Sequence, residues 1–234
     1  REENMLLKSG KHNWTIVRPY LTYSETRLQL GFFEQNAWLL RAISGKTIVF
    51  SEDLSSKYTT MTYGKDVARA ISLLVGNEKA FGETVNISCG QSLLWNDVLN
   101  IYCDEIEKCI GKRVPVKIVE RAPIENYPTE KWTYLYDRLY NRRFSNKKLL
   151  TMVGEVTFVT PEDGLRHCIR EFIKSPNRYG YSVAEQALFD RITGEHLTKR
   201  EISSLRDIAT YVLYRYFSRE TIKEIKGIVR KIIK

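Results

Sequence analysis

The stretch W-T-I-V-R-P, Trp14 to Pro19, decides the fold class of this chain. Its apolar, β-branched residues predict a short buried strand that ends at the Arg-Pro pair. An irregular segment rich in tyrosine follows, Tyr20-Leu21-Thr22-Tyr23-Ser24. In open α/β sheets, ligands bind at the carboxyl ends of parallel strands. The segment therefore lies where a cofactor or substrate would bind, although a buried strand followed by a plain loop explains the pattern equally well.

The elements expected after this strand alternate between helices and short strands, which favours an α/β fold. A strong helix start stands at Thr160-Pro161, with a threonine cap, proline at the first position and acids in the first turn. Residues 120–158 are rich in Tyr, Trp and Arg and are harder to assign. The further expected elements are helices over 32–43, 67–75 and 95–110, strands over 47–50, 84–88 and 114–119, a polar turn over 51–57 and an extended stretch over 58–62.

The composition restricts the class of protein. The 234 residues, of which 43% are hydrophobic, suit one large domain or two small ones. We find no run of 18 apolar residues and no signal peptide. The four cysteines and three histidines have no metal-site spacing, which indicates reduced thiols, a cytoplasmic protein and no metal site. The net charge of +9 fits an anionic ligand, nucleic acid or a membrane surface, but also plain solvated faces.

Five sequence motifs follow one another at plausible spacing, and together they resemble a known family. They are T-I-V-R-P (15–19), W-L-L-R-A-I-S-G-K-T-I-V-F (38–50), T-T-M-T-Y-G-K-D-V-A-R-A (59–70), G-E-T-V-N-I-S (82–88), and F-S-N-K-K-L-L (144–150) with V-T-P-E-D-G-L-R (159–166). In this order they resemble the downstream half of the extended short-chain dehydrogenase/reductases, the NAD-dependent epimerase/dehydratase group that acts on nucleotide sugars. The resemblance implies the C-terminal part of a Rossmann-type α/β fold with a small mixed α/β substrate domain.

Two motifs of that family do not occur at the matching place in this sequence. These are the Gly-rich dinucleotide fingerprint and the Tyr-x-x-x-Lys catalytic pair, which lie upstream of the first motif in the family. We therefore assign no catalytic residue. The intact protein is expected to use NAD or NADP, whereas this chain alone is expected to bind neither and to turn over no substrate. Because the sequence opens within a helix and without Met, we expect it to be the downstream part of a longer enzyme.

The resemblance implies a ligand site in the loop after the first strand. In the family this loop touches both nicotinamide and sugar. Pro19, Tyr20 and Leu21 are accordingly implied as cofactor-binding residues, and Thr22 and Tyr23 as substrate-binding residues. Leu21 stands where the common family form has Asn, which replaces a polar group by an apolar one. Simple packing of the tyrosines is an equally good explanation.

The resemblance also implies cationic groups that bind a diphosphate. Thr59 stands where many family members carry an arginine for this task, and threonine cannot replace its charge. Lys57 has the charge and lies two residues earlier, although a plain surface lysine fits better there. Arg121, in E-R-A-P, matches a region with another diphosphate-binding arginine, and Arg27 follows the tyrosine-rich loop. We include all four residues as substrate-binding candidates.

The leading functional prediction is the substrate-binding portion of an NAD(P)-dependent nucleotide-sugar epimerase, dehydratase or reductase. Its ligand would be a nucleotide-diphosphate sugar, and it would form a homodimer, as such enzymes often do. The alternative is a non-catalytic basic module of the same fold that binds RNA or another polyanion, with nucleic acid the less favoured partner.

The resemblance covers residues 1–174, and residues 175–234 are predicted to form a helical extension. Two amphipathic helices are expected there, over 199–217 and 219–233. An isolated helix of this length is marginal in water, so the second needs a partner for its apolar stripe of Ile222, Ile225, Val229, Ile232 and Ile233. Docking onto Ile208, Val212 and Phe217 of the first helix is favoured, a subunit contact is second and an anionic membrane is third.

Overall fold

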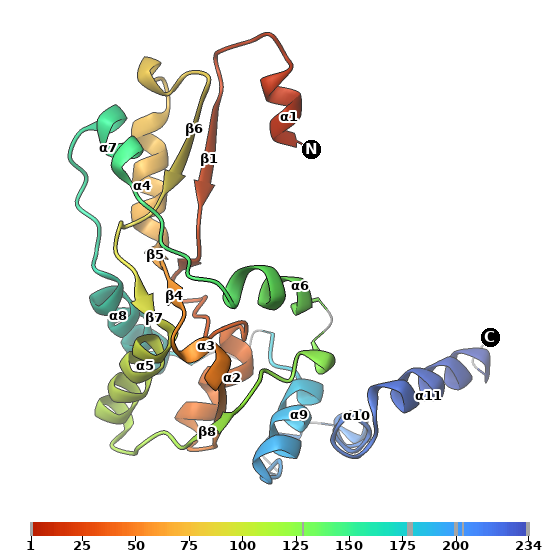
Figure 1. Cartoon of the computed structure of the whole chain (residues 1–234). Helices are drawn as coiled ribbons and strands as arrows, with labels where there is room; N and C mark the ends of the chain where they lie inside the picture. The colour runs from red at the N-terminus through yellow and green to blue at the C-terminus, as the bar shows by residue number, and fades with distance from the viewer. Residues whose placement is uncertain (1, 128, 177–179, 199–200, 203, 233–234) are drawn as a thin grey trace.

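The computed structural model describes the chain except residues 1, 128, 177–179, 199–200, 203 and 233–234 (Figure 1). The strands are β1 (Thr15–Pro19), β2 (Thr22–Tyr23), β3 (Ile48–Ser51), β4 (Tyr58–Thr59), β5 (Thr62–Tyr63), β6 (Glu83–Ile87), β7 (Leu93–Leu94) and β8 (Val116–Val119). The α-helices are α1 (Glu2–Leu7), α2 (Gln35–Ile43), α3 (Glu52–Ser55), α4 (Gly64–Leu74), α5 (Trp95–Ile110), α6 (Lys131–Thr133), α7 (Lys147–Val153), α8 (Pro161–Lys174), α9 (Val183–Thr193), α10 (Leu205–Tyr216) and α11 (Arg219–Ile232). Two short 3₁₀ turns, η1 (Glu78–Ala80) and η2 (Ile124–Asn126), and one π-helical segment, η3 (Tyr134–Arg138), complete the order.

The strands pair two by two, and three of the four pairs are parallel. β1 runs parallel to β6, β2 to β5 and β3 to β8, whereas β4 and β7 are antiparallel. In the first pair Pro19 lies opposite Ile87, so both strands end at the same level. Parallel strands need long crossover connections, which the helices of this chain supply. The predicted mixed α/β fold is confirmed.

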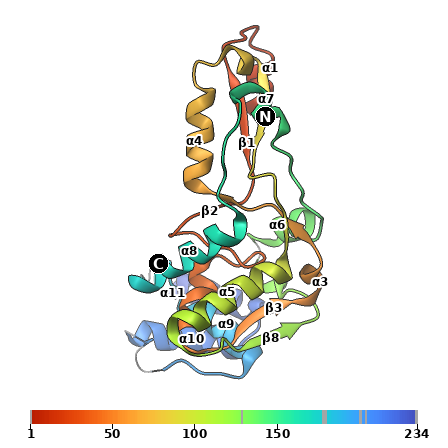
Figure 2. The same ribbon diagram turned by 90° about the vertical axis from the view of Figure 1, so that its left-hand side faces the viewer.

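Two apolar clusters form the core of the described chain. The larger one contains the stacked rings of Trp38 and Tyr102, whose centroids lie 4.7 Å apart. The smaller one lies between α4, β6 and α7 and includes Val85 and Leu149, both fully buried. In Figure 2, α4 covers one side of the β1–β6 pair, while α5 and α8 lie together in the lower part of the molecule. The β1–β6 pair and the lower part of the molecule thus pack around separate apolar clusters.

The structure corrects two predictions about helices. The polar turn expected over 51–57 contains the short helix α3. The helix α9 lies within the predicted helical extension but is additional to the two helices expected there. It runs between Ser182, whose hydroxyl accepts a hydrogen bond from the Glu185 amide, and Gly194. Five consecutive residues of α9, 186–190, are buried. A helix buried on most sides lacks a single apolar stripe, so the periodicity of its sequence does not reveal it. The start expected for the next helix, at residue 199, lies outside the described residues.

Buried charges join the C-terminal helices to the body. Arg41 of α2 and Asp190 of α9 form an ion pair at 2.6 Å, and both side chains are fully buried. Asp190 also accepts a hydrogen bond of 2.8 Å from the Tyr211 hydroxyl of α10. Breaking such a pair leaves an uncompensated buried charge, which typically costs about 3–5 kcal/mol. The extension is therefore firmly attached, and the division at residues 174 and 175 stays a prediction.

Glu185, in the first turn of α9, is partly buried next to other acids. Burial and then the carboxylates of Glu130 and Glu34 raise its pKa from 4.5 to about 7. Between these two values the folded chain holds a proton that the unfolded chain releases, so the free energy of unfolding falls as the pH rises. The loss is complete above about pH 7.

We predict that Glu185→Gln stabilises the protein above pH 7 and has little effect near pH 4, because glutamine carries no charge to desolvate. The gain should be on the order of 1–3 kcal/mol at high pH. Urea unfolding at a series of pH values measures it. Glu78→Gln, at an exposed position in η1, is the matched control and should leave the pH profile unchanged. A gain for Glu185→Gln that is equal at all pH values would contradict the prediction.

Candidate functional site

The loop after β1 begins at the carboxyl end of that strand, level with the end of β6. Within it, Leu21 has a φ of 38°, the one positive value among the described residues other than glycine. Its carbonyl oxygen accepts a hydrogen bond of 3.1 Å from the Thr62 amide, next to the β2–β5 pair. A left-handed leucine is strained, and such strain often marks a functional segment. The loop thus leaves β1 by a sharp and fixed turn.

Tyr20, the first residue of this loop, is held by partners far away in the sequence. Its hydroxyl donates to Oδ2 of Asp137 at 3.0 Å, and its ring lies 4.5 Å from that of Phe144, centroid to centroid. Burial raises the pKa of the Tyr20 phenol strongly, against the opposing charge of Arg138. The phenol therefore stays protonated and acts as a hydrogen-bond donor rather than as a base.

Arg138 is a buried cation at the centre of this region, with 5% of its surface exposed. Its Nε donates to the carbonyl oxygen of Gly31 at 3.0 Å, and its Nη2 donates to Oε1 of Gln29 at 3.2 Å. Its Nη1 pairs with the carboxylate of Asp137. The guanidinium also lies 5.8 Å from the ring of Trp95. Each of its three nitrogens donates at least one hydrogen bond and its charge is paired with Asp137, so it supports the site and is not itself free for an anion.

Two further arginines extend from this network to the surface. The Nε of Arg142 lies 2.7 Å from Oδ1 of Asp137, and the Arg142 amide donates to the Tyr58 carbonyl oxygen at 2.8 Å. The guanidinium of Arg143 stacks on the ring of Tyr58 at 3.6 Å. Arg143 is exposed and has no carboxylate within ion-pairing distance in the described part of the chain. Its charge is therefore available to an anionic ligand.

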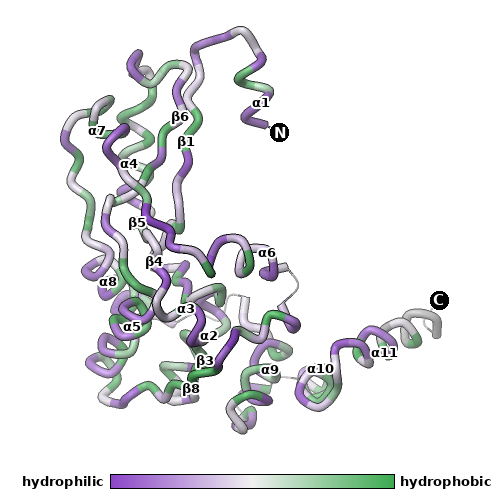
Figure 3. The backbone as a smooth tube through the Cα atoms, viewed as in Figure 1, coloured by the Kyte–Doolittle hydropathy of each residue, from purple (hydrophilic) through white to green (hydrophobic). Residues whose placement is uncertain are grey.

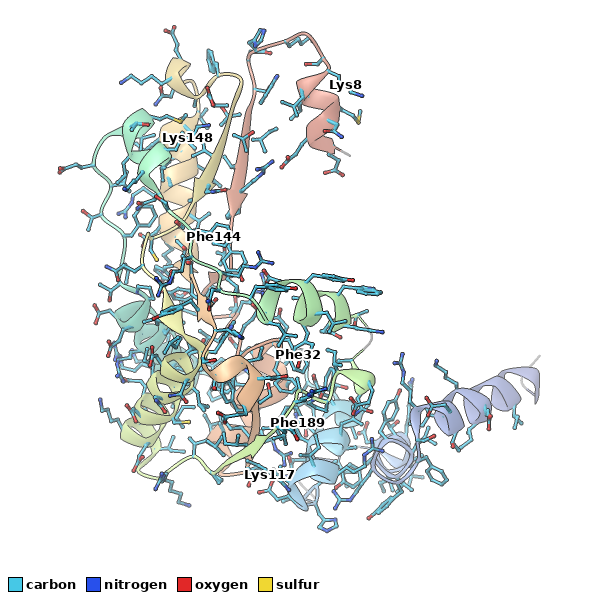
Figure 4. The ribbon with its side chains drawn as sticks, in the orientation of Figure 1. Lys8, Phe32, Lys117, Phe144, Lys148 and Phe189 are labelled. Atoms are coloured by element: carbon cyan, nitrogen blue, oxygen red, sulfur yellow. The ribbon has the colours of Figure 1, made fainter. Side chains whose placement is uncertain are left out.

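An open groove of about 650 Å³ runs beside Arg143. Its walls come from β4, from the turn after β6 and from the segment that leads to α7, which passes Phe144 in Figure 4. Gly90 has a φ of 76°, and a Cβ there would lie 3.0 Å from Oδ1 of Asn146, so a larger residue would displace this wall. Among the described residues that line the groove, Arg143 and Lys147 are cations and none is an acid. The full lining is Tyr58, Gly90, Ser92, Arg143, Phe144, Ser145, Asn146 and Lys147.

Two of the predicted site residues are engaged elsewhere. Tyr23 is 1% exposed and packs against Gly164 of α8, and its hydroxyl has no hydrogen-bond partner in the described structure. Arg27 forms an ion pair of 3.0 Å with Glu34 at the surface. Tyr23 therefore supports the core in this conformation, and the charge of Arg27 is already balanced.

The other predicted residues border the network. Thr59 is fully buried and pairs with Leu93 across the β4–β7 ladder. Lys57 is half-buried just before β4, whereas Arg121 is exposed just after β8. Burial and then the hydrogen bond to Asp53 raise the pKa of the Tyr134 phenol, and the charge of Arg121 opposes that rise.

The ends of the loop differ in exposure. Pro19 is exposed at the end of β1, and Thr22 is half-buried and pairs with Thr62.

Sequence reasoning did not assign Asp137, Arg138, Arg142 and Arg143 to the site. The sequence shows that this segment is rich in Tyr, Trp and Arg, but it assigns no role to these four residues. Asp137 is 117 positions away from its partner Tyr20, a contact that only the fold reveals. The one sign of these residues in the sequence is the pair Asp137-Arg138, followed closely by the pair Arg142-Arg143.

Comparison with known proteins identifies the fold. No family model and no curated protein matches the sequence. Among solved structures, Pal from Bacillus thuringiensis is 18% identical with a TM-score of 0.52, and 75% of this chain aligns with 51% of Pal. RMD from Pseudomonas aeruginosa, complexed with NADPH, is 12% identical with a TM-score of 0.51 over 69% of this chain and 48% of RMD.

A third solved structure is similar to this chain to the same extent. UDP-glucose 4-epimerase with UDP-glucose, from Thermotoga maritima, is 19% identical with a TM-score of 0.50, covering 75% of this chain and 50% of the epimerase. The fold is that of the extended short-chain dehydrogenase/reductases. The chain spans about half the length of these structures. The resemblance seen in the sequence is thus confirmed at the level of the fold.

We predict that Gly164→Ala destabilises the protein by about 1–3 kcal/mol, the usual cost of overpacking. The added Cβ would lie 1.9 Å from the Tyr23 hydroxyl oxygen and 2.9 Å from Cζ. Tyr23→Phe removes that oxygen and should partly rescue Gly164→Ala, while costing little alone because the hydroxyl has no partner. Urea unfolding of the two single variants and the double variant measures this coupling.

The matched control is Gly227→Ala in α11, where an added Cβ meets nothing within 4 Å. It should be neutral or slightly stabilising, since alanine favours helix. A double variant no more stable than Gly164→Ala would show that the hydroxyl of Tyr23 does not limit packing against α8.

Proposed function

We propose that this chain is the substrate-binding portion of an NAD(P)-dependent nucleotide-sugar epimerase, dehydratase or reductase. The observation that carries the proposal is the loop of Tyr20, placed at the carboxyl ends of β1 and β6 in this fold. Ligands of open α/β sheets bind at such strand ends. Solved structures with the same fold include one complexed with NADPH and one with UDP-glucose.

In this proposal the nucleotide-diphosphate sugar lies across the loop and the neighbouring cations. Residues 19–22 face the sugar, and the diphosphate is held by Arg143, with Lys57 and Arg121 as further candidates. A guanidinium can bind two phosphate oxygens at once, and its stacking on Tyr58 fixes its plane in advance. Arg143, whose charge is not paired with a carboxylate in the described structure, takes the role of the diphosphate-binding arginine that many family members carry at the position of Thr59.

When bound, the nicotinamide would supply the hydride chemistry. The part of this chain that would face it is the turn of Pro19, Tyr20 and Leu21, where Pro19 is exposed and Leu21 is fixed by its hydrogen bond to Thr62. These residues orient the ring and the sugar relative to one another. Tyr20, protonated and bonded to Asp137, keeps the loop in place and does not carry a proton in the reaction.

One observation favours the alternative of a basic module that binds RNA. Trp132 and Tyr136 stack with centroids 5.6 Å apart, and their exposed fractions are 59% and 64%. Lys131 lies 5.2 Å from the Trp132 ring. Exposed aromatic rings beside cations are a common platform for the bases of single strands. The binding of RNA should therefore be measured in parallel with that of the nucleotide sugar.

We predict that the chain binds UDP-glucose and that Arg143→Ala weakens this binding by about 1.5–3 kcal/mol, the usual cost of a lost charged contact. Isothermal titration calorimetry measures both. Arg206→Ala, at an exposed position in α10, is the matched control and should leave the affinity unchanged. Lys57→Ala and Arg121→Ala, measured in parallel, decide whether either shares the diphosphate. NADH is expected not to bind.

Two outcomes would contradict the proposal. Equal affinities of Arg143→Ala and Arg206→Ala for UDP-glucose would remove Arg143 from the site. Binding of a short single-stranded RNA without any binding of UDP-glucose, lost in Trp132→Ala, would favour the RNA-binding module instead.

A further inference from the structure

The outer face of α10 is apolar and open to solvent. Leu205, Ile208, Val212 and Tyr216 are 84%, 44%, 42% and 64% exposed, and their spacing places them in one stripe along the helix. Tyr211, which directly precedes Val212, lies on an adjoining side of the helix, and its hydroxyl donates to Asp190 of α9. This buried hydrogen bond fixes the rotation of α10 and leaves the apolar stripe exposed beside the contact with α9.

The next helix leaves this stripe uncovered. Ile222 in the first turn of α11 is 6% exposed and lines a small cavity of about 270 Å³ with Leu188 and Phe217, whereas Ile228 is 58% exposed. In Figure 1, α11 extends away from α9 and α10. The predicted docking of α11 onto α10 is therefore seen only in part: Ile222 is buried beside Phe217, whereas Ile208 and Val212 stay exposed. The predicted stripe residues Val229, Ile232 and Ile233 lie outside the described side chains.

Positive charge accompanies the open apolar surface. In Figure 3 hydrophilic and hydrophobic residues alternate along α11, as in an amphipathic helix. Residues 219–234 contain two acids, Glu220 and Glu224, against six cations: Arg219, Lys223, Lys226, Arg230, Lys231 and Lys234. Lys223 is exposed. An exposed apolar stripe next to clustered lysine and arginine is the pattern of helices that lie on anionic membranes.

A second copy of this chain fits the surface less well, on two grounds. Self-association through α11 would bring two segments of the same positive charge together. The stripe on α10 spans 12 residues. It is therefore about 18 Å long and about 10 Å wide, roughly 200 Å². A stable dimer buries about 800 Å² on each partner.

We propose that α10 and α11 form a docking surface for an anionic lipid bilayer. The apolar side chains of Leu205, Ile208, Val212 and Ile228 enter the boundary between head groups and acyl chains, while the exposed Lys223 contacts the anionic head groups. No described helix is long and apolar enough to cross a bilayer.

Co-sedimentation with vesicles tests this proposal. The chain should bind vesicles of phosphatidylcholine and phosphatidylserine, and bind far less to phosphatidylcholine alone or at high salt. Ile208→Gln with Ile228→Gln should weaken binding about tenfold by removing apolar contact. Lys223→Gln should weaken it about fivefold by removing one charge. These side chains are exposed, so the variants should fold.

Matched controls use the opposite end of the molecule. Leu73→Gln in α4, at a position 45% exposed, and Lys79→Gln in η1 should bind vesicles as the unchanged chain does. Equal binding of all variants, or equal binding to neutral vesicles, would overturn the proposal. So would a dimer in light scattering that Ile208→Gln with Ile228→Gln dissociates in the absence of lipid. Affinity for UDP-glucose should not change in these variants, which separates this test from that of the proposed function.

Discussion

The buried guanidinium of Arg138 is the constraint on which the candidate site depends. It joins the loop of Gln29 and Gly31 to the segment that carries Asp137, and through Asp137 it reaches Tyr20. A buried cation without these partners would be costly, so the segments that surround it have to be placed together. The π-helical segment η3 ends at Arg138, and such wide helical turns are frequent at functional sites. One cation thus fixes the first strand, its loop and the surface arginines relative to one another.

The basic residues of this chain have two different roles, which the net charge alone does not separate. Arg41 and Arg138 are buried and paired, and they connect segments that are distant in the sequence. Arg143 and Lys223 are exposed, and an open groove lies beside Arg143. A net charge of +9 is compatible with either role. The argument for an anionic ligand therefore rests on the exposed cations and not on the total charge.

Much of the fold could be predicted from the sequence where local signals were strong. The helix 95–110 was predicted with its observed limits, because an apolar stripe and a terminal glycine mark it. The helix α9 was missed because Gln186 and Asp190 are buried together with their apolar neighbours, which removes the stripe. The loop of Tyr20 could be located from the strand before it. Its partner Asp137 could not, since hydrogen bonds between distant segments leave no local pattern.

The two open surfaces lie in different parts of the fold, which makes both proposals compatible in one molecule. The groove of Arg143 is built on β4 and the segment before α7, whereas the lipid-facing stripe is built on α10 and α11. In Figure 1 α9 stands between α10 and the rest of the body, with α11 beyond it. The ion pair of Arg41 with Asp190 and the hydrogen bond from Tyr211 fix α9 and α10 to the body. A bilayer bound at α10 would therefore hold the whole chain while the groove of Arg143 stays open to a ligand.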